Sequence, residues 1–339
     1  MAGRFDSLGD WLAAAAGAAS ARITAMSRLS GGAIQENWLL DVTLDGGRLA
    51  GARQWVLRTD AASTISTSLG RAQEFAILRA AFRAGVSAPE PLLLCEDEGV
   101  IGGPFYIMAR GRGTAHARRI TRDPALARFG PALAGRLGRE LARLHRVTPP
   151  VEGLGFLDVP QGHHAAARIA GYRADLDALP DGHPILEAAL NWLEDNMPAS
   201  NGTVLCHTDF RTGNYMVADG ELSVIVDWEF ASFSDPYEDI GWLCARCWRF
   251  GNDDLTVGGI AGLEDFLSAY EAETGLAVNR AALPNWQVMA ELRWGIIALQ
   301  QAQCCNSGTE ITQELALTGL MPAEMELNIL NLIDGARAA

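Results

Sequence analysis

Short stretches rich in apolar and β-branched residues, separated by turn residues, predict β-strands in the first third of the chain. There are five of them: residues 22–27, 38–44, 54–58, 91–95 and 104–108. Between the third and the fourth, residues 69–84 follow a helical period, which places Phe75 and Leu78 on one face. The order of these elements predicts a small antiparallel sheet accompanied by one helix.

Helical periodicity dominates the remainder of the chain. The expected helices cover residues 124–147, 185–196, 262–274 and 286–306. Residues 12–19 are rich in alanine and resemble a signal sequence only weakly, because Asp6 and Asp10 precede them, so a helix is expected there instead. The whole pattern predicts an α+β fold, in which a larger and mostly helical part follows the small sheet.

Two apolar runs in the second half of the chain end in acidic residues. The first run ends at Asp209, and Asn214 follows five positions later. After a turn, a second run over residues 222–226 ends at Asp227. Two buried strands would bring an acid, an amide and a second acid to one edge. Phosphoryl transfer uses this set, because it needs a carboxylate to orient and deprotonate a hydroxyl and two oxygen ligands for Mg²⁺.

At these residues the chain resembles the aminoglycoside phosphotransferase and choline kinase family, which is related to the protein kinases. The spacing from His207 through Asp209 to Asn214 matches the catalytic loop of that family. Asp227 stands where the family has its metal-binding aspartate. Asp239 falls in a segment, Asp-Pro-Tyr-Glu-Asp-Ile, that resembles the one following the metal site, and it would brace the catalytic loop.

Two further segments resemble the small lobe of the same family. Residues 29–32, followed by Asn37 and Trp38, resemble the nucleotide loop of one branch, which includes the kinase-like domains joined to acyl-CoA dehydrogenases. The resemblance runs from about residue 25 to 300 and implies a protein kinase-like fold of two lobes. It implies an N-lobe, a hinge and a C-lobe over residues 1–108, 109–113 and 114–339.

The resemblance also implies which residues bind the nucleotide, ATP or GTP. They are Ser30, Gly31, Gly32, Arg58, Glu74, Met108, Ala109 and Gly111. Arg58 stands where the phosphate-binding lysine is expected, and Glu74 on the following helix would pair with it. A plain hairpin turn also explains the glycines at 31 and 32, and a solvent-facing position also explains Glu74.

The catalytic residues implied are Asp209, as the base that orients the acceptor, and Arg211. Arg211 stands where protein kinases carry a lysine that faces the γ-phosphate, although a salt bridge to an acceptor carboxylate or to the protein is an alternative. Asn214 and Asp227 are the expected ligands of Mg²⁺, against the alternative of ordinary turn residues. His207 is expected to be structural.

Four tryptophans after residue 240 lie in helix-like segments, with arginines among them. They are Trp242, Trp248, Trp286 and Trp294. They are expected either to line an acceptor pocket or to pack in the core.

Composition narrows the choice of function. All 27 basic residues are arginine, which excludes a Walker-A site because that motif requires lysine. The six cysteines show no zinc-site spacing and are expected to be buried, reduced thiols, which suits a cytoplasmic protein. Residues 151–339 hold 28 acidic residues and 8 arginines, which argues against a nucleic-acid partner. No run of 18 apolar residues is present, so no membrane span is expected.

The sequence therefore predicts an ATP- and Mg²⁺-dependent O-phosphotransferase that acts on a small hydroxylated molecule. The acceptor is left open among an aminoglycoside, an amino alcohol such as choline, a sugar and a hydroxyacyl compound. The oligomeric state is also left open. The alternative is a nucleotide-binding pseudokinase with a regulatory role.

Overall fold

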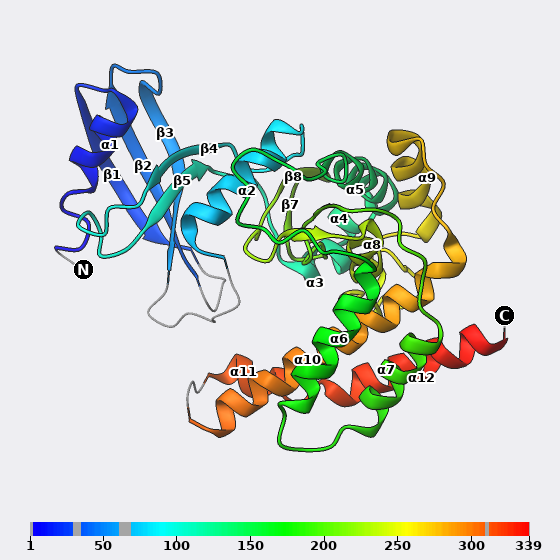
Figure 1. Ribbon diagram of the computed structural model, residues 1–339. Helices are drawn as coiled ribbons and strands as arrows, with labels where there is room; N and C mark the ends of the chain where they lie inside the picture. The colour runs from blue at the N-terminus through cyan, green and yellow to red at the C-terminus, as the bar shows by residue number, and fades with distance from the viewer. Residues whose placement is uncertain (1–2, 30–34, 61–68, 309–311, 339) are drawn as a thin grey trace. The chain divides into compact units, whose positions relative to one another are not determined.

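The computed structural model describes residues 3–29, 35–60, 69–308 and 312–338 (Figure 1). Ser30, Gly31 and Gly32 of the predicted nucleotide loop lie outside these residues. The chain divides into two compact units. The first unit comprises Met1–Gly113, Pro150–Phe156 and Ser223–Ala231, and the second comprises Thr114–Pro149, Leu157–Leu222 and Ser232–Ala339. The assignment of residues 1–108, 109–113 and 114–339 to lobes and hinge stays a prediction.

The first unit is built on a five-stranded antiparallel sheet with the strand order β1-β2-β3-β5-β4. The five predicted strands are confirmed as β1 (Ser20–Arg28), β2 (Gln35–Asp45), β3 (Gly51–Asp60), β4 (Pro91–Cys95) and β5 (Phe105–Ala109). The helix predicted between β3 and β4 is confirmed as α2 (Arg71–Arg83).

The N-terminal helix α1 (Leu8–Ala16) packs on this sheet. Leu8 and Leu12 are fully buried in one core cluster with strand residues such as Trp38 and Phe105. The helix was predicted over residues 12–19, but it begins earlier and ends at Gly17, whose left-handed backbone (φ 64°) stops it.

The second unit is mostly helical. Its helices are α3 (Ala117–Arg122), α4 (Pro124–Ala127), α5 (Gly130–Leu144), α6 (His164–Asp177), α7 (Pro184–Asp195), α8 (Pro236–Cys244), α9 (Leu263–Thr274), α10 (Leu283–Asn306), α11 (Gln313–Thr318) and α12 (Pro322–Ala338). Short 3₁₀ turns cover Arg246–Trp248 and Arg280–Ala282. The short strands are β6 (Val204–Cys206), β7 (Tyr215–Ala218) and β9 (Ser232–Ser234), and the boundary between the units falls within β8 (Glu221–Ile225).

The single helix predicted over residues 124–147 is wrong, because the chain breaks it into α4 and α5. Asp123 caps α4 by accepting a hydrogen bond from the backbone N–H of Ala125 at 3.0 Å. Gly130, where α5 begins, lies against the Ile260 carbonyl, since a Cβ there would come within 1.9 Å of that oxygen. The contact requires glycine at this position, and the break itself follows from Pro131 in the first turn of α5, which has no N–H to continue a preceding helix.

The structure also bears on the cysteines and on the question of a membrane span. Cys304 is exposed, so the prediction that all six cysteines are buried is wrong. Among the described residues, no helix combines the length and the apolar character that crossing a bilayer requires.

Candidate active site

The predicted catalytic loop leaves β6, all three residues of which are buried. Asp239 on α8 accepts the backbone N–H of His207 at 2.8 Å and that of Thr208 at 2.7 Å. Thr208 has a left-handed backbone (φ 60°), which is costly for a β-branched residue and persists only where neighbours enforce it. The expected bracing role of Asp239 is thereby confirmed.

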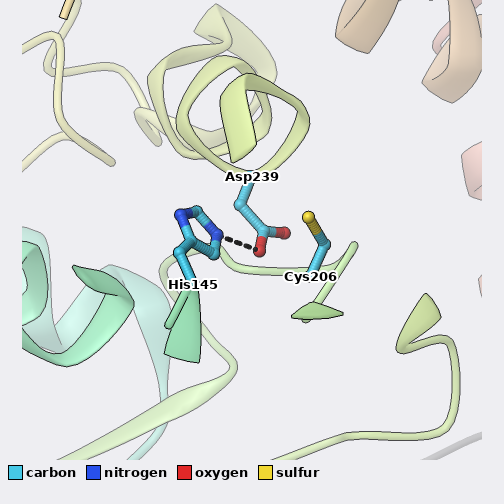
Figure 2. A group of neighbouring side chains, drawn as sticks. All are labelled: His145, Cys206 and Asp239. Atoms are coloured by element: carbon cyan, nitrogen blue, oxygen red, sulfur yellow. Dashed lines mark hydrogen bonds and ion pairs between the residues drawn. The ribbon is translucent and has the colours of Figure 1, made fainter. Parts of the chain in front are cut away.

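A buried group behind this loop has the composition of a metal site. It consists of His145, Cys206 and Asp239, whose candidate ligand atoms lie within 4.8 Å of one another (Figure 2). Each has a protein partner already: His145 contacts Asp239 at 3.2 Å and Tyr270 at 2.8 Å. Burial raises the pKa of the Cys206 thiol well above its usual value, which disfavours the thiolate that a metal needs. The group therefore supports the catalytic loop and is not a convincing metal centre.

The structure brings together the three predicted residues of the loop. The Asp209 side chain, only 13% exposed, accepts a hydrogen bond on Oδ1 from Arg211 Nε at 3.0 Å. The Asn214 amide donates to the Asp209 carbonyl oxygen at 2.9 Å and also to its Oδ2. Arg211 thus adopts the alternative considered above, a salt bridge within the protein, and its guanidinium lies over the ring of Trp248 at 4.4 Å.

Trp242 completes the surroundings of Asp209. Its indole Nε1–H donates to Asp209 Oδ1 at 2.8 Å. The sequence marked this tryptophan as an acceptor-pocket or core residue and did not connect it with Asp209. Asp239 and Trp242 are three residues apart, which places both on one face of α8. This spacing is the feature of the sequence that could have placed Trp242 near the loop that Asp239 braces.

In the first unit, Arg58 and Glu74 form a buried ion pair. Arg58 Nε lies 3.0 Å from Glu74 Oε1, and both side chains are at most 5% exposed. Arg58 Nη1 lies 3.1 Å from the Asp227 carboxylate. Burial by itself lowers the pKa of Arg58, but nearby negative charge, from Glu74 above all, raises it above the usual arginine value. The guanidinium therefore stays charged.

A second buried arginine, Arg71, was missed by the sequence analysis. It forms a short ion pair with Glu74 and another with Asp60 at 2.9 Å, and it donates to the Leu69 carbonyl oxygen at 2.8 Å. Glu74 thus forms ion pairs with two arginines, Arg58 and Arg71. Arg71 and Glu74 are three residues apart on α2, a spacing that the sequence did contain.

The groups around Arg58 fit a phosphate and a divalent cation. Arg58 Nη2 is buried and has no hydrogen-bond partner among the described residues, so an N–H remains for a phosphate oxygen. Asp227 lies just beyond β8, which ends at Ile225, and has a side chain 39% exposed on a left-handed backbone (φ 63°). Its carboxylate is the hard oxygen donor that Mg²⁺ prefers.

Comparison with known proteins decides the family. A family model described as the phosphotransferase enzyme family matches residues 25–292 of the 339 residues. The chain belongs to this family. It is therefore a phosphotransferase, whose family acts on hydroxyl groups of small molecules.

Relatives and solved structures agree with this assignment. Acyl-CoA dehydrogenase family member 10 of Mus musculus is 28% identical over 251 residues, covering 69% of this chain and 22% of that protein. The chain thus spans about a quarter of the length of the first curated relatives it matches.

Two solved structures show the fold. A structure from Ralstonia eutropha JMP134, proposed to be an aminoglycoside phosphotransferase, is 19% identical, has a TM-score of 0.76 and covers 98% of both chains. An amicoumacin kinase bound to AMP-PNP and Ca²⁺ is 17% identical, has a TM-score of 0.61 and covers 96% of this chain and 93% of that one. The predicted α+β, protein kinase-like fold is confirmed.

The predicted adenine-binding segment of the phosphotransferase lies at the end of β5. Met108 and Ala109 pair with Val56 and Trp55 of β3, and Gly111 follows the strand. The backbone N–H of Ala109 donates to the Glu90 carbonyl oxygen at 2.9 Å. These residues are ordered by the sheet, and their role towards a nucleotide stays a prediction.

The four tryptophans proposed for an acceptor pocket or the core of the phosphotransferase divide into two groups. Trp242, Trp248 and Trp294 form a chain of ring contacts, with centroids 5.2 and 4.9 Å apart. Trp286 packs elsewhere in the core, 6.4 Å from the Tyr237 ring. Core packing therefore accounts for Trp286, whereas Trp242 and Trp248 also contact Asp209 and Arg211.

Proposed function

We propose that this phosphotransferase transfers the γ-phosphate of ATP or GTP to a hydroxyl group of a small molecule and uses Mg²⁺. The observation that carries the proposal is the arrangement of Asp209. Its carboxylate follows a buried strand and accepts hydrogen bonds from Trp242, Arg211 and Asn214. A general base in phosphoryl transfer needs this fixed placement, because most of the rate enhancement comes from alignment and charge stabilisation.

In this proposal Asp209 aligns the acceptor hydroxyl and accepts its proton. Asn214 and Asp227 supply oxygen ligands to Mg²⁺, which neutralises charge on the phosphates when it is bound. Arg211 now pairs with Asp209. A phosphate would compete for this guanidinium, which is the planar, bidentate donor that phosphate oxygens accept best.

The remaining nucleotide contacts are assigned to the first unit. Arg58 binds the phosphates through Nη2, which lies 3.9 Å from the Glu229 carboxylate and has no hydrogen-bond partner among the described residues, and Glu74 fixes its orientation. Ser30, Gly31 and Gly32 lie outside the described residues, and their assignment to the phosphates rests on the sequence, because the two glycines would let backbone N–H groups approach closely. Met108, Ala109 and Gly111 contact adenine through the backbone. AMP-PNP and Ca²⁺ in the structurally similar amicoumacin kinase support the use of a nucleotide with a divalent cation.

The acceptor stays open among an aminoglycoside, an amino alcohol, a sugar and a hydroxyacyl compound. The net charge of −14 suits a cationic acceptor. The similarity to acyl-CoA dehydrogenase family member 10 favours a hydroxyacyl compound. A cytoplasmic location, where ATP is available, belongs to the same proposal.

A nucleotide-binding pseudokinase with a regulatory role is the second candidate. Two observations favour the pseudokinase. Arg58 stands in place of the usual lysine, and two donors already occupy Asp209 Oδ1. Retention of Asp209, Asn214 and Asp227 favours the enzyme instead, since a protein without catalysis has no need of all three.

The test is a screen of hydroxylated metabolites and antibiotics for ADP release that depends on the acceptor and on Mg²⁺. The Asp209→Asn variant is the control. We expect at least one acceptor to be phosphorylated by the wild type and not by the variant. ADP release that Asp209→Asn leaves unchanged would refute the proposed base. The pseudokinase would be established by two results together. ATP would shift the melting temperature by the same amount with and without Mg²⁺, and no acceptor would be turned over.

A further inference from the structure

The four tryptophans of α8, α10 and the 3₁₀ turn Arg246–Trp248 differ in what their indole N–H groups contact. Those of Trp248, Trp286 and Trp294 are buried and have no hydrogen-bond partner among the described residues. The indole N–H of Trp242 donates to Asp209 Oδ1 at 2.8 Å. Within the described part of the chain, three of these tryptophans are therefore packed without a hydrogen bond from the indole N–H. Trp242 differs, because its N–H donates to the candidate base.

Trp242 is itself held in place by Arg293 on α10. The Arg293 guanidinium lies over the Trp242 ring at 4.5 Å, and its Nη1 donates to the carbonyl oxygen of Thr208. Thr208 is the residue with the left-handed backbone, directly before Asp209. The two side chains thus hold consecutive residues of the loop, one by its backbone and the other by its carboxylate.

The approach of α8 to α10 makes this arrangement possible. A Cβ on Gly241 would lie 2.6 Å from the Trp286 Cβ and 2.8 Å from its carbonyl oxygen. Only glycine therefore permits this separation between the helices. Trp242 follows Gly241 on α8, and Arg293 lies two turns beyond Trp286 on α10, so both side chains are carried by helices that are fixed against each other.

We propose that Trp242, supported by Arg293, is a positioning residue that sets the orientation of the Asp209 carboxylate. The inference rests on the proposed function, in which Asp209 accepts the hydroxyl proton. Oδ1 accepts hydrogen bonds from Trp242 and from Arg211, and Oδ2 accepts from Asn214. Trp242 is thus one of three donors that fix the rotation of the carboxylate, and it is the one carried by α8. Misplacement of a catalytic group by about 1 Å can lower turnover by roughly 100-fold.

The test compares Trp242→Phe with Trp286→Phe. Both tryptophans are buried, 3% and 2% exposed, but only Trp242 has a partner for its N–H. The assay is ADP release from Mg-ATP, with water as the acceptor. We expect Trp242→Phe to lower kcat by roughly 10- to 100-fold and to leave the KM for Mg-ATP within about twofold. Trp286→Phe should keep kcat close to the wild type.

A second variant separates the hydrogen bond from the shape of the ring. Benzothienylalanine at position 242 replaces the indole N–H by sulfur and keeps the bicyclic ring, so it preserves the packing and the contact with Arg293. It should reproduce the loss of kcat seen with Trp242→Phe.

Three results would overturn the inference or its basis. A wild-type kcat in the sulfur analogue would show that the N–H does not position Asp209. Equal losses in Trp242→Phe and Trp286→Phe would show a general packing effect. If Asp209→Asn itself keeps the wild-type rate, the proposed function is wrong. If Asp209→Asn is inactive and the sulfur analogue at position 242 is fully active, only the proposed role of Trp242 is wrong.

Discussion

The guanidinium of Arg58 lies 3.1 Å, from Nη1 to Oδ1, from the carboxylate of Asp227. Its Nε lies 3.0 Å from Glu74 on α2, so one planar group connects two carboxylates from different elements. An arginine achieves this because its donors are spread over a rigid fork, whereas a lysine presents one compact charge. The chain contains no lysine, and in the proposed nucleotide site arginine takes the place of that residue.

Arg58→Lys should weaken nucleotide binding, because an ammonium group cannot reach both carboxylates and still face a phosphate. Hydrogen bonds to charged groups contribute about 1.5–3 kcal/mol each, so loss of one should raise the KM for Mg-ATP by about tenfold or more. Steady-state kinetics with varied Mg-ATP measures this. Arg53→Lys, an exposed arginine on the same strand, is the control. An unchanged KM in Arg58→Lys would remove Arg58 from the nucleotide site.

Glu74→Gln should destabilise the first unit. Glu74 is 1% exposed and pairs with Arg58 and Arg71, which are 4% and 1% exposed. Breaking a buried ion pair on one side costs about 3–5 kcal/mol, and the low end is expected here because Asp60 and Asp227 remain as partners.

Urea unfolding measures this loss as a change in the free energy of unfolding. The control is Glu187→Gln, which breaks the ion pair between Arg173 and a glutamate that is 40% exposed. That change should cost less than about 1 kcal/mol. Equal losses in the two variants would show that the buried pairs contribute no more than a surface pair.

Gly241→Ala should separate α8 from α10, because the new Cβ would meet the backbone and Cβ of Trp286 at 2.6–2.8 Å. Overpacking of this kind costs about 1–3 kcal/mol, and it should also reduce activity by displacing Trp242. The matched control is Gly295→Ala on α10, where a Cβ would find side-chain atoms no closer than 3.5 Å. That variant should be neutral or more stable, since alanine favours a helix by about 1 kcal/mol over glycine.

The elements that carry the site could be predicted because their signals are local. The five strands and α2 follow from short apolar patterns, and the acid at 209, the amide at 214 and the acid at 227 are read directly from their spacing. The pair of Arg58 and Glu74, 16 residues apart, came from the resemblance to a family and not from the pattern itself.

The contacts that orient those residues could not be predicted. Trp242 and Asp209 are 33 residues apart, and nothing near either residue indicates that they meet. Their contact depends on the separation of two helices, which a glycine at 241 sets through a tertiary contact. The glycine at 130 has a similar origin, since the Ile260 carbonyl lies where a longer side chain would stand.

Glu291 on α10 should make stability depend on pH. Its side chain is fully buried, with Oε2 accepting from Asn328 and Oε1 from the backbone N–H of Cys247, both at 3.1 Å. Burial raises its pKa above the ordinary glutamate value of 4.5. The folded state then binds this proton more tightly than the unfolded state, so the contribution of Glu291 to stability is greatest at low pH. It falls as pH rises from 4.5 through the raised pKa.

Urea unfolding of the wild type and of Glu291→Gln across this pH range tests the effect, because the difference removes the titration of all other groups. The glutamine variant should gain stability relative to the wild type as pH rises, with a limiting slope of about 1.4 kcal/mol per pH unit. Glu264→Gln provides the opposite sign, since the hydrogen bond from Arg280 lowers the pKa of Glu264. That variant should lose stability relative to the wild type as pH rises towards 4.5, by less because Glu264 is exposed, and the difference should stay constant above 4.5. A difference for Glu291→Gln that does not change with pH would mean that the buried carboxylate keeps one protonation state throughout.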